Sequence, residues 1–389
     1  MGALIFGLTI FFLGLQTAYL CYYAAWAAFG AKPKAPEANR PPQTRFAVLL
    51  PAYREDGVIV GSAAEALKQD YPAGLFQVIV IADQLQPDTL VQLRKMPVEI
   101  VEVAFERSTK ARALQATLAR YEEDAFDAAL VLDADNHMAP EVLRRMDAAF
   151  QQGHEVLQGR RIAKNTHTAY AQLDTLSEAI NNRLFRRGVQ AAGGSPALIG
   201  SGMAFRFSSF KSLMADIDAV SGFDKQLELA MLARGIRAHY LEDARILDEK
   251  VSGGDHFTRQ RGRWLAAQWL YGPALLIPAL RLWRKTGNRL YLAKVIQHVL
   301  LPRPVLMAML LLLLVPAFFL GAWAFAISLI HLLFFGLSML LALPPVLRNR
   351  RLMGSLLHLP LATLRMLLAL KWLRKATREF IHTPHSAHA

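Results

Sequence analysis

Long apolar stretches stand near both ends of the chain, and a region of short alternating runs lies between them. Residues 3–29 are almost all apolar or aromatic, and further apolar stretches cover about residues 292–316 and 318–343. Each is long enough to cross a bilayer, since a spanning helix needs about 20 apolar residues. The pattern therefore predicts one spanning helix before the central region and two after it.

Between residues 44 and 255, short β-prone runs alternate with helical segments, which is typical of βαβ units and a mostly parallel sheet. The predicted strands are 45–53, 76–83, 98–105 and 128–135, with shorter ones at 154–160, 198–206 and 237–243. The predicted helices lie near 57–69, 86–95, 109–124, 140–151, 166–187 and 224–234. The sequence thus predicts an α/β fold flanked by membrane helices.

The apolar run from Leu352 to Leu373 differs from the predicted spans because it contains His358 and Arg365 and is followed by basic residues. If it spanned the membrane, those charges would be exported, so we predict that it lies in the cytosolic interface. The predicted organisation is an N-terminal transmembrane helix (1–30), a proline-rich linker (31–43), a cytosolic domain (44–255), amphipathic interfacial helices (256–289), two transmembrane helices (290–346) and an interfacial helix with a tail (347–389).

Composition and charge agree with a membrane-bound protein that carries a globular domain. The 389 residues are 53% hydrophobic with a net charge of +13, and the mean hydropathy is +0.23. Lys and Arg collect beside the hydrophobic segments, which favours a membrane surface over nucleic acid as their partner, and no nucleic-acid-binding motif is present. The only cysteine, Cys21, excludes a disulfide within the chain and a thiolate zinc cluster.

Basic residues also predict the orientation in the membrane. They follow Phe29 and recur at 348–351 and at 371–378. Since short cytoplasmic segments carry an excess of Lys and Arg, we expect an extracytoplasmic N-terminus, a cytosolic central domain and a cytosolic C-terminus. The uncharged start favours a retained helix over a cleaved signal peptide.

The predicted strand 128–135 stops at two carboxylates, Asp133 and Asp135. Ligands of parallel sheets bind beyond the carboxyl ends of the strands, and two aspartates there form a hard oxygen site for Mg²⁺ or Mn²⁺. The alternative is structural, with Asp133 in a strand-end turn and Asp135 capping a helix near Pro140.

Further polar residues follow neighbouring strands. Asp83 ends the second strand, where it can accept hydrogen bonds from the base or ribose of a nucleotide. Lys110 stands at a helix start, where a cation and the helix N-terminus can both meet phosphate; a solvated charge is the alternative. The stretch Gly200-Ser201-Gly202 supplies a flexible backbone that can approach a sugar or an acceptor.

Taken with Gln260-Arg-Gly-Arg-Trp264 before the second apolar region, this order of motifs resembles the membrane-integrated family 2 glycosyltransferases of the QxxRW type, which include cellulose, hyaluronan and chitin synthases. The resemblance covers about residues 45–265. It implies a nucleotide-binding sheet domain of the GT-A type, a UDP-sugar donor, a divalent metal and inversion at the anomeric carbon. It also implies a glycan or lipid-linked acceptor, partner subunits for export, and a place in the bacterial inner membrane.

Roles carried across from the resemblance fall on individual positions. Asp83 would contact the uridine, Lys110 and Gln260 the nucleotide, Asp133 and Asp135 the nucleotide and the metal, Arg263 the diphosphate, and Trp264 with Gly200, Ser201 and Gly202 the acceptor. The structural alternatives are a snorkelling cation for Arg263 and a membrane-interface anchor for Trp264.

The resemblance places the catalytic base at Asp224, although the usual Glu-Asp pair is here Phe223-Asp224. A literal Glu-Asp pair occurs at Glu242-Asp243. Position favours Asp224, because it opens a helix that is followed by a strand and then by the QxxRW motif, whereas we expect Asp243 to end that strand. The structural alternative for Asp224 is a helix N-cap.

Three functions remain open at this point. The first is polysaccharide synthesis at the membrane. The second has the same chemistry but a single transfer, to ceramide, diacylglycerol or a polyprenyl carrier, and is separated from the first by the number of sugars added. The third is an inactive regulatory subunit that binds nucleotide or glycan, suggested by Phe223; release of UDP from any sugar donor would exclude it.

Overall fold

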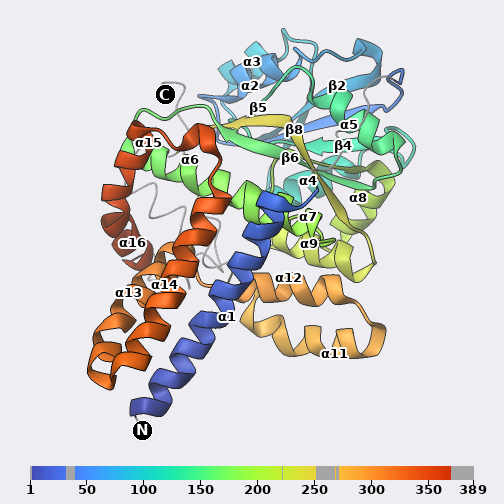
Figure 1. The fold of residues 1–389 in the computed structure, drawn as a ribbon. Helices are drawn as coiled ribbons and strands as arrows, with labels where there is room; N and C mark the ends of the chain where they lie inside the picture. Colours follow the sequence, from blue (N-terminus) through green and yellow to red (C-terminus); the bar gives the residue numbers. More distant parts are fainter. Residues whose placement is uncertain (1, 32–39, 221, 251–267, 269–270, 369–389) are drawn as a thin grey trace.

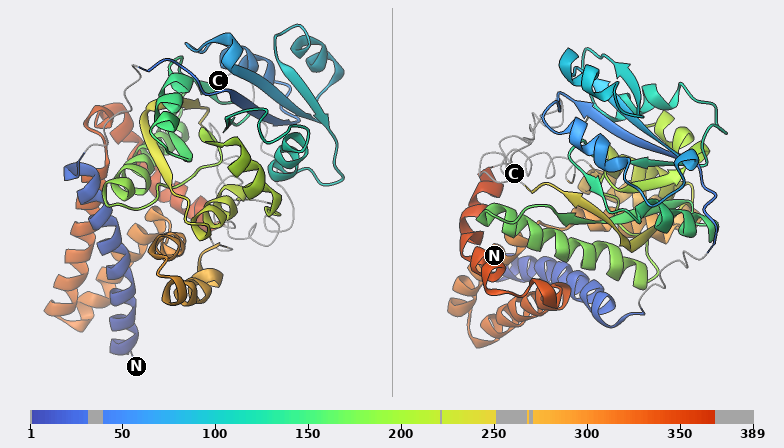
Figure 2. Two further views of the ribbon diagram at one scale, coloured as in Figure 1. Left: turned by 90° about the vertical axis from the view of Figure 1, so that its right-hand side faces the viewer. Right: turned by 90° about the horizontal axis from the view of Figure 1, so that it is seen from above.

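The protein consists of an α/β domain from which a group of long helices projects (Figure 1). The computed structural model describes residues 2–31, 40–220, 222–250, 268 and 271–368. Figure 2 gives the same arrangement from two further sides, with the N-terminus at the far end of the projecting helices. The motif Gln260–Trp264 lies outside the described residues, as do residues 256–267, 269 and 270 of the predicted interfacial segment 256–289.

The strands form a mixed sheet in the order β3-β2-β1-β4-β7-β6-β8-β5. They are β1 (Phe46–Tyr53), β2 (Phe76–Asp83), β3 (Glu99–Val103), β4 (Ala128–Val131), β5 (His137–Met138), β6 (Val156–Ala163), β7 (Met203–Arg206) and β8 (Ala238–Asp248). Strands β1 to β4 run parallel, β7 is antiparallel to both of its neighbours, and β6 and β8 are again parallel. The predicted α/β class with a mostly parallel sheet is confirmed.

Helices surround the sheet and continue into the projecting group. In the domain they are α2 (Ile59–Ala66), α3 (Pro87–Leu93), α4 (Lys110–Leu118), α5 (Val142–Gln151), α6 (Ala169–Asn181), the π-helix η2 (Asn182–Gly188), α7 (Val189–Ala191), α8 (Phe207–Ala215) and α9 (Phe223–Ala233). The others are α1 (Gly2–Phe29), α11 (Leu276–Thr286), α12 (Arg289–Val299), α13 (Arg303–Leu320), α14 (Ala322–Ala342), α15 (Arg350–Gly354) and α16 (Leu359–Leu368). Short 3-10 turns are η1 (Ala73–Leu75), η3 (Pro273–Leu275), η4 (Pro345–Leu347) and η5 (Ser355–His358).

Both faces of the sheet are covered, because side chains of a strand alternate between its faces. Phe46, Val48 and Leu50 of β1 pack into a core with α2 and α5, while Ala47 and Leu49 pack into a second core with α4, α8 and α9. This double burial explains why β1 reads as a continuous apolar run. Polar groups at the strand ends are thereby held on a rigid frame.

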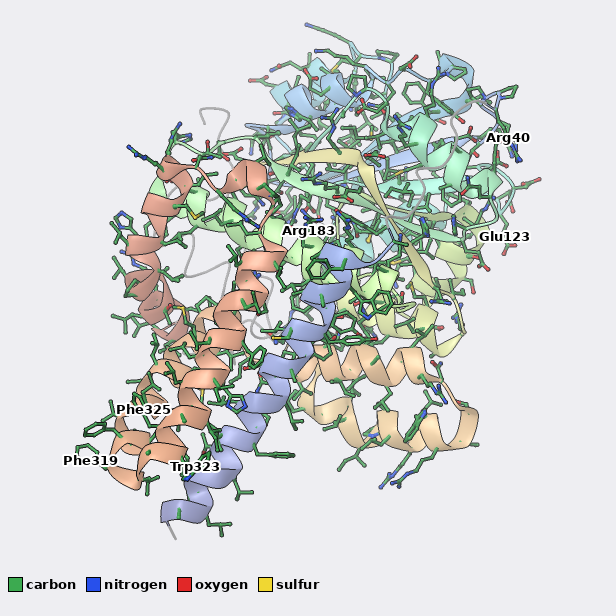
Figure 3. All side chains as sticks on the ribbon, viewed as in Figure 1. Arg40, Glu123, Arg183, Phe319, Trp323 and Phe325 are labelled. Carbon is green, nitrogen blue, oxygen red and sulfur yellow. The ribbon has the colours of Figure 1, made fainter. Side chains whose placement is uncertain are left out.

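Among the described residues, three helices are long and apolar enough to cross a membrane, namely α1, α13 and α14. They pack together through residues such as Leu13, Leu310 and Phe335. Phe319 and Trp323 stand on either side of the turn between α13 and α14, at the end of the helices far from the domain (Figure 3). Their side chains are 81% and 85% exposed. Exposed aromatic and aliphatic side chains along these helices suit contact with lipid.

The predicted span 292–316 is wrong in its start, because the chain breaks between α12 and α13. Leu300 and Leu301 are not helical, and α13 begins at Arg303. Pro302 accounts for the break, since it disfavours helical geometry in the residue before it. The predicted segment 290–346 therefore holds α12 as well as the two spans.

Two strand ends near the site also differ from the prediction, and one helix was not predicted. Strand β4 ends at Val131, so Asp133 and Asp135 stand in the turn after it rather than in the strand. Strand β8 continues to Asp248, so Asp243 lies within the strand and does not end it. Helix α8 was not predicted, because its aromatic residues follow β7 without a turn signal.

The described part of the C-terminal apolar run folds as the short helices α15, η5 and α16, which return to the domain. Leu352 packs with Leu176 of α6, and Ala362 of α16 packs with Leu173. Helix α6 thus separates the sheet from the projecting helices and contacts both sides (Figure 1).

Candidate active site

A pocket of about 560 Å³ opens at the carboxyl ends of β1, β2 and β4. Its walls include Asp83, Lys110, Asp133, Asp135 and Asp224. Its volume lies within the range of sites that hold small organic ligands, about 300–1,000 Å³. The tertiary structure therefore brings together five residues that the sequence motifs singled out separately.

Asp83, the last residue of β2, is a buried carboxylate at one end of this pocket. It is 2% exposed, and its Oδ1 atom has no hydrogen-bond partner among the described residues. Burial raises the pKa of Asp83, although the nearby Ser108 hydroxyl and the charge of Arg54 act in the opposite direction. An unsatisfied buried acceptor is costly, so this atom is suited to a donor group on a ligand.

Lys110 joins the start of α4 to the turn after β4. Its Nζ donates to Asp133 Oδ1 at 2.5 Å and to the Gly200 carbonyl oxygen at 2.7 Å. The side chain of Lys110 is 18% exposed and that of Asp133 37%. The pair is thus accessible from the pocket, and Thr109 caps the helix by accepting from the Arg112 N–H, which agrees with the predicted helix start.

Asp135 lies deeper than Asp133 and is held by backbone and side-chain donors. Its carboxylate accepts from Asn136 Nδ2 at 3.2 Å and from the Glu249 N–H at 3.3 Å, and Lys164 Nζ donates to its carbonyl oxygen. Asn136 also donates to Asp248 at 3.0 Å. Asp135 does not cap the following helix, because the N-cap of α5 is Glu141. The capping alternative for Asp135 is therefore excluded.

Asp224 stands in the first turn of α9, lines the same pocket, and lies beside Gly200. The N-cap of α9 is Gly222, which adopts a left-handed conformation, so Asp224 does not serve as the cap. Its Oδ2 lies 3.3 Å from Lys225 Nζ. The neighbouring Phe223 is buried, and Lys110 Nζ lies 5.4 Å from the centre of its ring. The Phe223 ring is thus within cation-π distance of Lys110.

The glycine stretch Gly200–Gly202 reaches the pocket through Gly200. Gly200 and Gly202 have positive φ angles of 77° and 62°, which side chains with a Cβ rarely adopt. Among the three residues, only Gly200 lines the pocket; Ser201 and Gly202 lie behind it. The Ser201 hydroxyl accepts from the Asp133 N–H and donates to Asn136 Oδ1, so it fixes the turn after β4.

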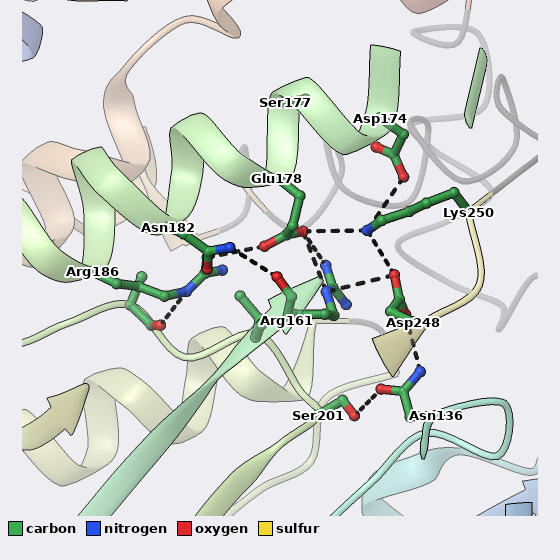
Figure 4. Close-up of polar contacts among 12 residues, drawn as sticks. Asn136, Arg161, Asp174, Ser177, Glu178, Asn182, Arg186, Ser201, Asp248 and Lys250 are labelled. Carbon is green, nitrogen blue, oxygen red and sulfur yellow. Dashed lines mark hydrogen bonds and ion pairs between the residues drawn. The ribbon is translucent and has the colours of Figure 1, made fainter. Parts of the chain in front are cut away.

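A buried network of charges forms another part of the wall and was missed by the sequence analysis (Figure 4). Glu178 accepts from Arg161 at 2.8 Å and from Arg186 at 3.0 Å. Lys250 Nζ lies 2.7 Å from Asp248 and 3.8 Å from Glu178. Burial by itself raises the pKa of Glu178, but the three cations outweigh it and hold the pKa well below the ordinary value.

A signal for this network was present in the sequence. Asp174, Glu178, Asn182 and Arg186 recur every four residues in the predicted helix 166–187. That spacing places polar side chains on one helical face. In the structure this face of α6 and η2 turns toward the pocket, and Asp248 links it through Asn136 to Asp135.

The other end of the pocket reaches the junction of the domain with the projecting helices. Gln297, His298 and Arg303 line it, and Arg303 donates to the Ser177 hydroxyl at 3.0 Å. Its apolar lining comes from Leu300, Leu301, Leu359, Ala362 and Met366. One pocket therefore connects the strand ends with the start of the span α13.

The remaining candidates do not lie on the described walls. Gln260, Arg263 and Trp264 fall outside the described residues. Asp243 is exposed on β8 and does not line the pocket, and Glu242 pairs with Arg187 at 3.6 Å. Asp224 thus lines the pocket, whereas Glu242 and Asp243 do not.

The cations and carboxylates on the pocket wall can hold an anionic ligand between them. In the described part of the chain, no group of three or more His, Cys, Asp or Glu side chains could hold a metal by itself. Asp133 and Asp135 offer two carboxylates, which suits a hard cation that takes its other ligands from water and from substrate phosphates. The carboxylate of Asp224, which lines the same pocket, can accept a proton.

Comparison with known proteins supports this description. Residues 41–267 match the family model described as glycosyltransferase like family 2. A search of curated proteins finds no match. Among solved structures, the mannosyltransferase PcManGT from Pyrobaculum calidifontis, in complex with GDP-Man and Mn²⁺, matches with a TM-score of 0.51 and 17% identity over 87% of this chain and 97% of that one. This likeness concerns the fold.

Two further solved structures match less well. TarS 1-349 from S. aureus, in complex with UDP-GlcNAc, has a TM-score of 0.37 and 18% identity over 74% of this chain and 89% of that one. Glucosyl-3-phosphoglycerate synthase from Mycobacterium tuberculosis, in complex with Mn²⁺, UDP and phosphoglyceric acid, has a TM-score of 0.40 and 16% identity over 60% of this chain and 79% of that one.

Proposed function

The chain belongs to the family of glycosyltransferases like family 2, and on this premise we propose that it transfers a sugar from a UDP-sugar to a glycan acceptor at the membrane, with inversion at the anomeric carbon. The observation that carries the proposal is that Asp224 lines the same pocket as Lys110, Asp133 and Asp135. Inverting transfer needs a proton acceptor on the face of the sugar opposite the leaving diphosphate.

The nucleotide end of the pocket is proposed at Asp83. Its unpartnered Oδ1 would accept a hydrogen bond from the uracil ring or from a ribose hydroxyl. Lys110, whose Nζ donates to Asp133 Oδ1, would also bind the diphosphate. The cation and the N-terminus of α4 both favour the negative charge that builds on the leaving group.

Asp133 and Asp135 would hold Mg²⁺ or Mn²⁺ together with the diphosphate. The donor set fits, because both are carboxylates on one turn and Mg²⁺ usually binds through one or two carboxylates plus phosphates. When bound, the metal neutralises charge on the diphosphate. PcManGT is a complex with Mn²⁺ and GDP-Man, so GDP-sugars belong among the donors to be tested.

Asp224 would act as the general base. As the acceptor oxygen bonds to the anomeric carbon, its proton passes to Asp224, and the bond from that carbon to the diphosphate breaks with its electron pair on the leaving group. Such a base contributes about 10²–10⁴-fold to the rate. Gly200 would lie beside the sugar, because it lines the same pocket as Lys110 and Asp224.

The QxxRW subtype belongs to the proposal on sequence grounds. Gln260 and Arg263 would contact the nucleotide and its diphosphate, and Trp264 would stack on an acceptor sugar. From the sequence we also propose that the protein is anchored in the bacterial inner membrane with its catalytic domain in the cytosol. Partner subunits would then export the product.

A second candidate is a single transfer to a lipid-linked acceptor. It is favoured by the apolar lining of Leu300, Leu301, Leu359 and Met366, which continues the pocket toward the spanning helices. A lipid tail could leave the pocket along these side chains. The two candidates differ in the number of sugars that are added to each acceptor.

The experiment is a screen of UDP-sugars and GDP-sugars with the purified protein in detergent. Metal-dependent release of UDP, suppressed by EDTA, is the expected result, and release of GDP alone would reject the UDP donor. Mass spectrometry of products formed in native membranes then distinguishes a polymer from a lipid that carries one sugar. No nucleotide release with any donor, in the presence of native membranes, would overturn the proposed activity.

A further inference from the structure

Helices α9 and α12 lie antiparallel at the boundary between the α/β domain and the membrane helices. Asn288, the N-cap of α12, donates to the Leu232 carbonyl oxygen near the end of α9 at 2.8 Å. Further along, Lys294 Nζ lies 2.9 Å from Glu228 Oε1. Asp224, one turn before Glu228, therefore faces the end of α12 that leads into the span α13.

Glu228 is fully buried, at 0% exposed, and joins three parts of the chain. Its Oε1 pairs with Lys294 and accepts the Leu198 N–H at 3.1 Å, and its Oε2 lies 3.7 Å from His298 Nε2. Lys294 Nζ also donates to the Ser195 carbonyl oxygen at 3.0 Å. One carboxylate thus connects α9, the segment before the glycine stretch and α12.

A buried ion pair of this kind is poorly explained by stability alone. Desolvation of both charges offsets most of their attraction, and apolar side chains of similar size would often stabilise as much or more. Unlike an apolar contact, the pair Glu228–Lys294 has a fixed geometry, because each charged atom must meet its own donors or acceptors. The contact therefore specifies how α9 sits on α12.

The contacts continue from Glu228 to the donor side of the pocket. Leu198 is held by α9 at both backbone groups, since Lys225 Nζ donates to its carbonyl oxygen at 3.0 Å and Glu228 accepts its N–H. Two residues later, the Gly200 carbonyl oxygen accepts from Lys110, which pairs with Asp133. Displacement of Glu228 would therefore move the base and the glycine stretch together.

We propose that Glu228 is a positioning residue: paired with Lys294, it holds the first turn of α9 and the Leu198–Gly202 segment in one register on α12. In that register Asp224 faces a sugar bound beside Lys110. Glu228 touches neither donor nor acceptor, and the inference rests on the proposed role of Asp224. A misplacement of about 1 Å is enough to cost about 10²-fold in rate.

The test compares Glu228→Gln, Lys294→Met and the double variant in purified protein. Glu228→Gln keeps the side-chain shape but removes the charge. We expect kcat to fall by at least about tenfold, with the KM for the donor changed by less than about twofold, because donor contacts remain. Hydrogen–deuterium exchange should become faster in residues 197–202 and 223–228. In the double variant the melting temperature should recover, because no unpaired charge is buried, while kcat stays low.

Asp147→Asn is the matched control. Asp147 is a buried carboxylate of α5, 2% exposed, that accepts from the N–H and the hydroxyl of Thr44 and does not line the pocket. It should lower the melting temperature without changing kcat. Unchanged exchange in Glu228→Gln would overturn the positioning role, as would recovery of kcat in the double variant, since charge balance alone would then suffice. If wild type releases no nucleotide, the proposed function fails, and the exchange measurement still decides the role of Glu228.

Discussion

Lys110 Nζ lies 2.5 Å from Asp133 Oδ1, so helix α4 is joined to the turn after β4 by an ion pair that faces the pocket. The cation and the carboxylate are therefore preorganised on the same wall. In the proposed reaction, Lys110 would pair with the diphosphate and Asp133 would be free to hold the metal. The cost of reorganisation is small because both side chains remain partly exposed.

Asp133→Asn and Asp135→Asn should each lower metal-dependent UDP release by about 10²-fold or more. Asp133 lies partly exposed in a turn, so the fold should persist in Asp133→Asn. Asp135 is in the same turn but is 4% exposed, and Asp135→Asn also loses charge beside the Glu249 N–H. Nucleotide release and circular dichroism measure the two effects. EDTA should reproduce the loss in wild type, and full activity in either variant would reject the metal assignment.

Asp224→Asn should abolish transfer, by about 10²–10⁴-fold, while UDP-sugar binding measured by calorimetry persists. Asp243→Asn is the matched control, because Asp243 is exposed on β8 away from the pocket and should retain turnover. The reverse pattern would show that the Glu-Asp dipeptide marks the base, and that position along the chain does not.

Asp83→Asn should weaken UDP binding by about tenfold or more, since a hydrogen bond to a charged group is lost. Burial raises the pKa of Asp83, so the carboxyl group holds its proton more tightly in the folded protein than in the unfolded chain. Stability is therefore lost as pH rises from the ordinary pKa of an aspartate through the raised pKa of Asp83. The ligand-free variant should melt at an equal or higher temperature; unchanged UDP affinity would contradict the assignment.

Glu178→Gln should destabilise the protein by about 3–5 kcal/mol, because Arg161 and Arg186 lose a buried partner. The depressed pKa of Glu178 means that its contribution is present above its ordinary value of 4.5 and is lost as pH falls below it. The melting temperature of wild type should therefore fall more steeply in acid than that of the variant.

The control for Glu178 is Glu102→Gln, which breaks the exposed pair with Arg94 at 2.7 Å. An exposed pair contributes at most about 1 kcal/mol, so the melting temperature should barely change. Equal losses in the two variants would contradict the structural role of the buried network.

The topology predicts that a membrane-impermeant thiol reagent reaches a cysteine at position 2 but not one at position 385 in intact cells. The native Cys21 is first replaced, because it lies in α1, where its Sγ donates to the Phe334 carbonyl oxygen. Labelling of position 385 alone would reverse the orientation inferred from the basic residues.

The sequence by itself determined the fold class, the helices that are long and apolar enough to cross a membrane, and the ends of β1, β2 and β7. Hydrophobic periodicity depends on which faces are buried, so β1, β2 and the spans are evident without a structure. The positions of Asp83, Lys110 and Asp224 at ends of elements follow from the same pattern. It could not give the continuation of β8 to Asp248, because pairing with neighbouring strands decides where a strand ends. The break before α13 had a local signal in Pro302, which the predicted span 292–316 passed over.

Only the tertiary structure decided which polar residues meet. The stripe from Asp174 to Arg186 was visible in the sequence, but its partners Arg161 and Lys250 come from strand β6 and from the end of β8. The pair Glu228–Lys294 joins residues that lie far apart in sequence. Local patterns fix which side of a helix is polar, whereas long-range packing fixes what that side faces, and the shape of the pocket follows from the packing.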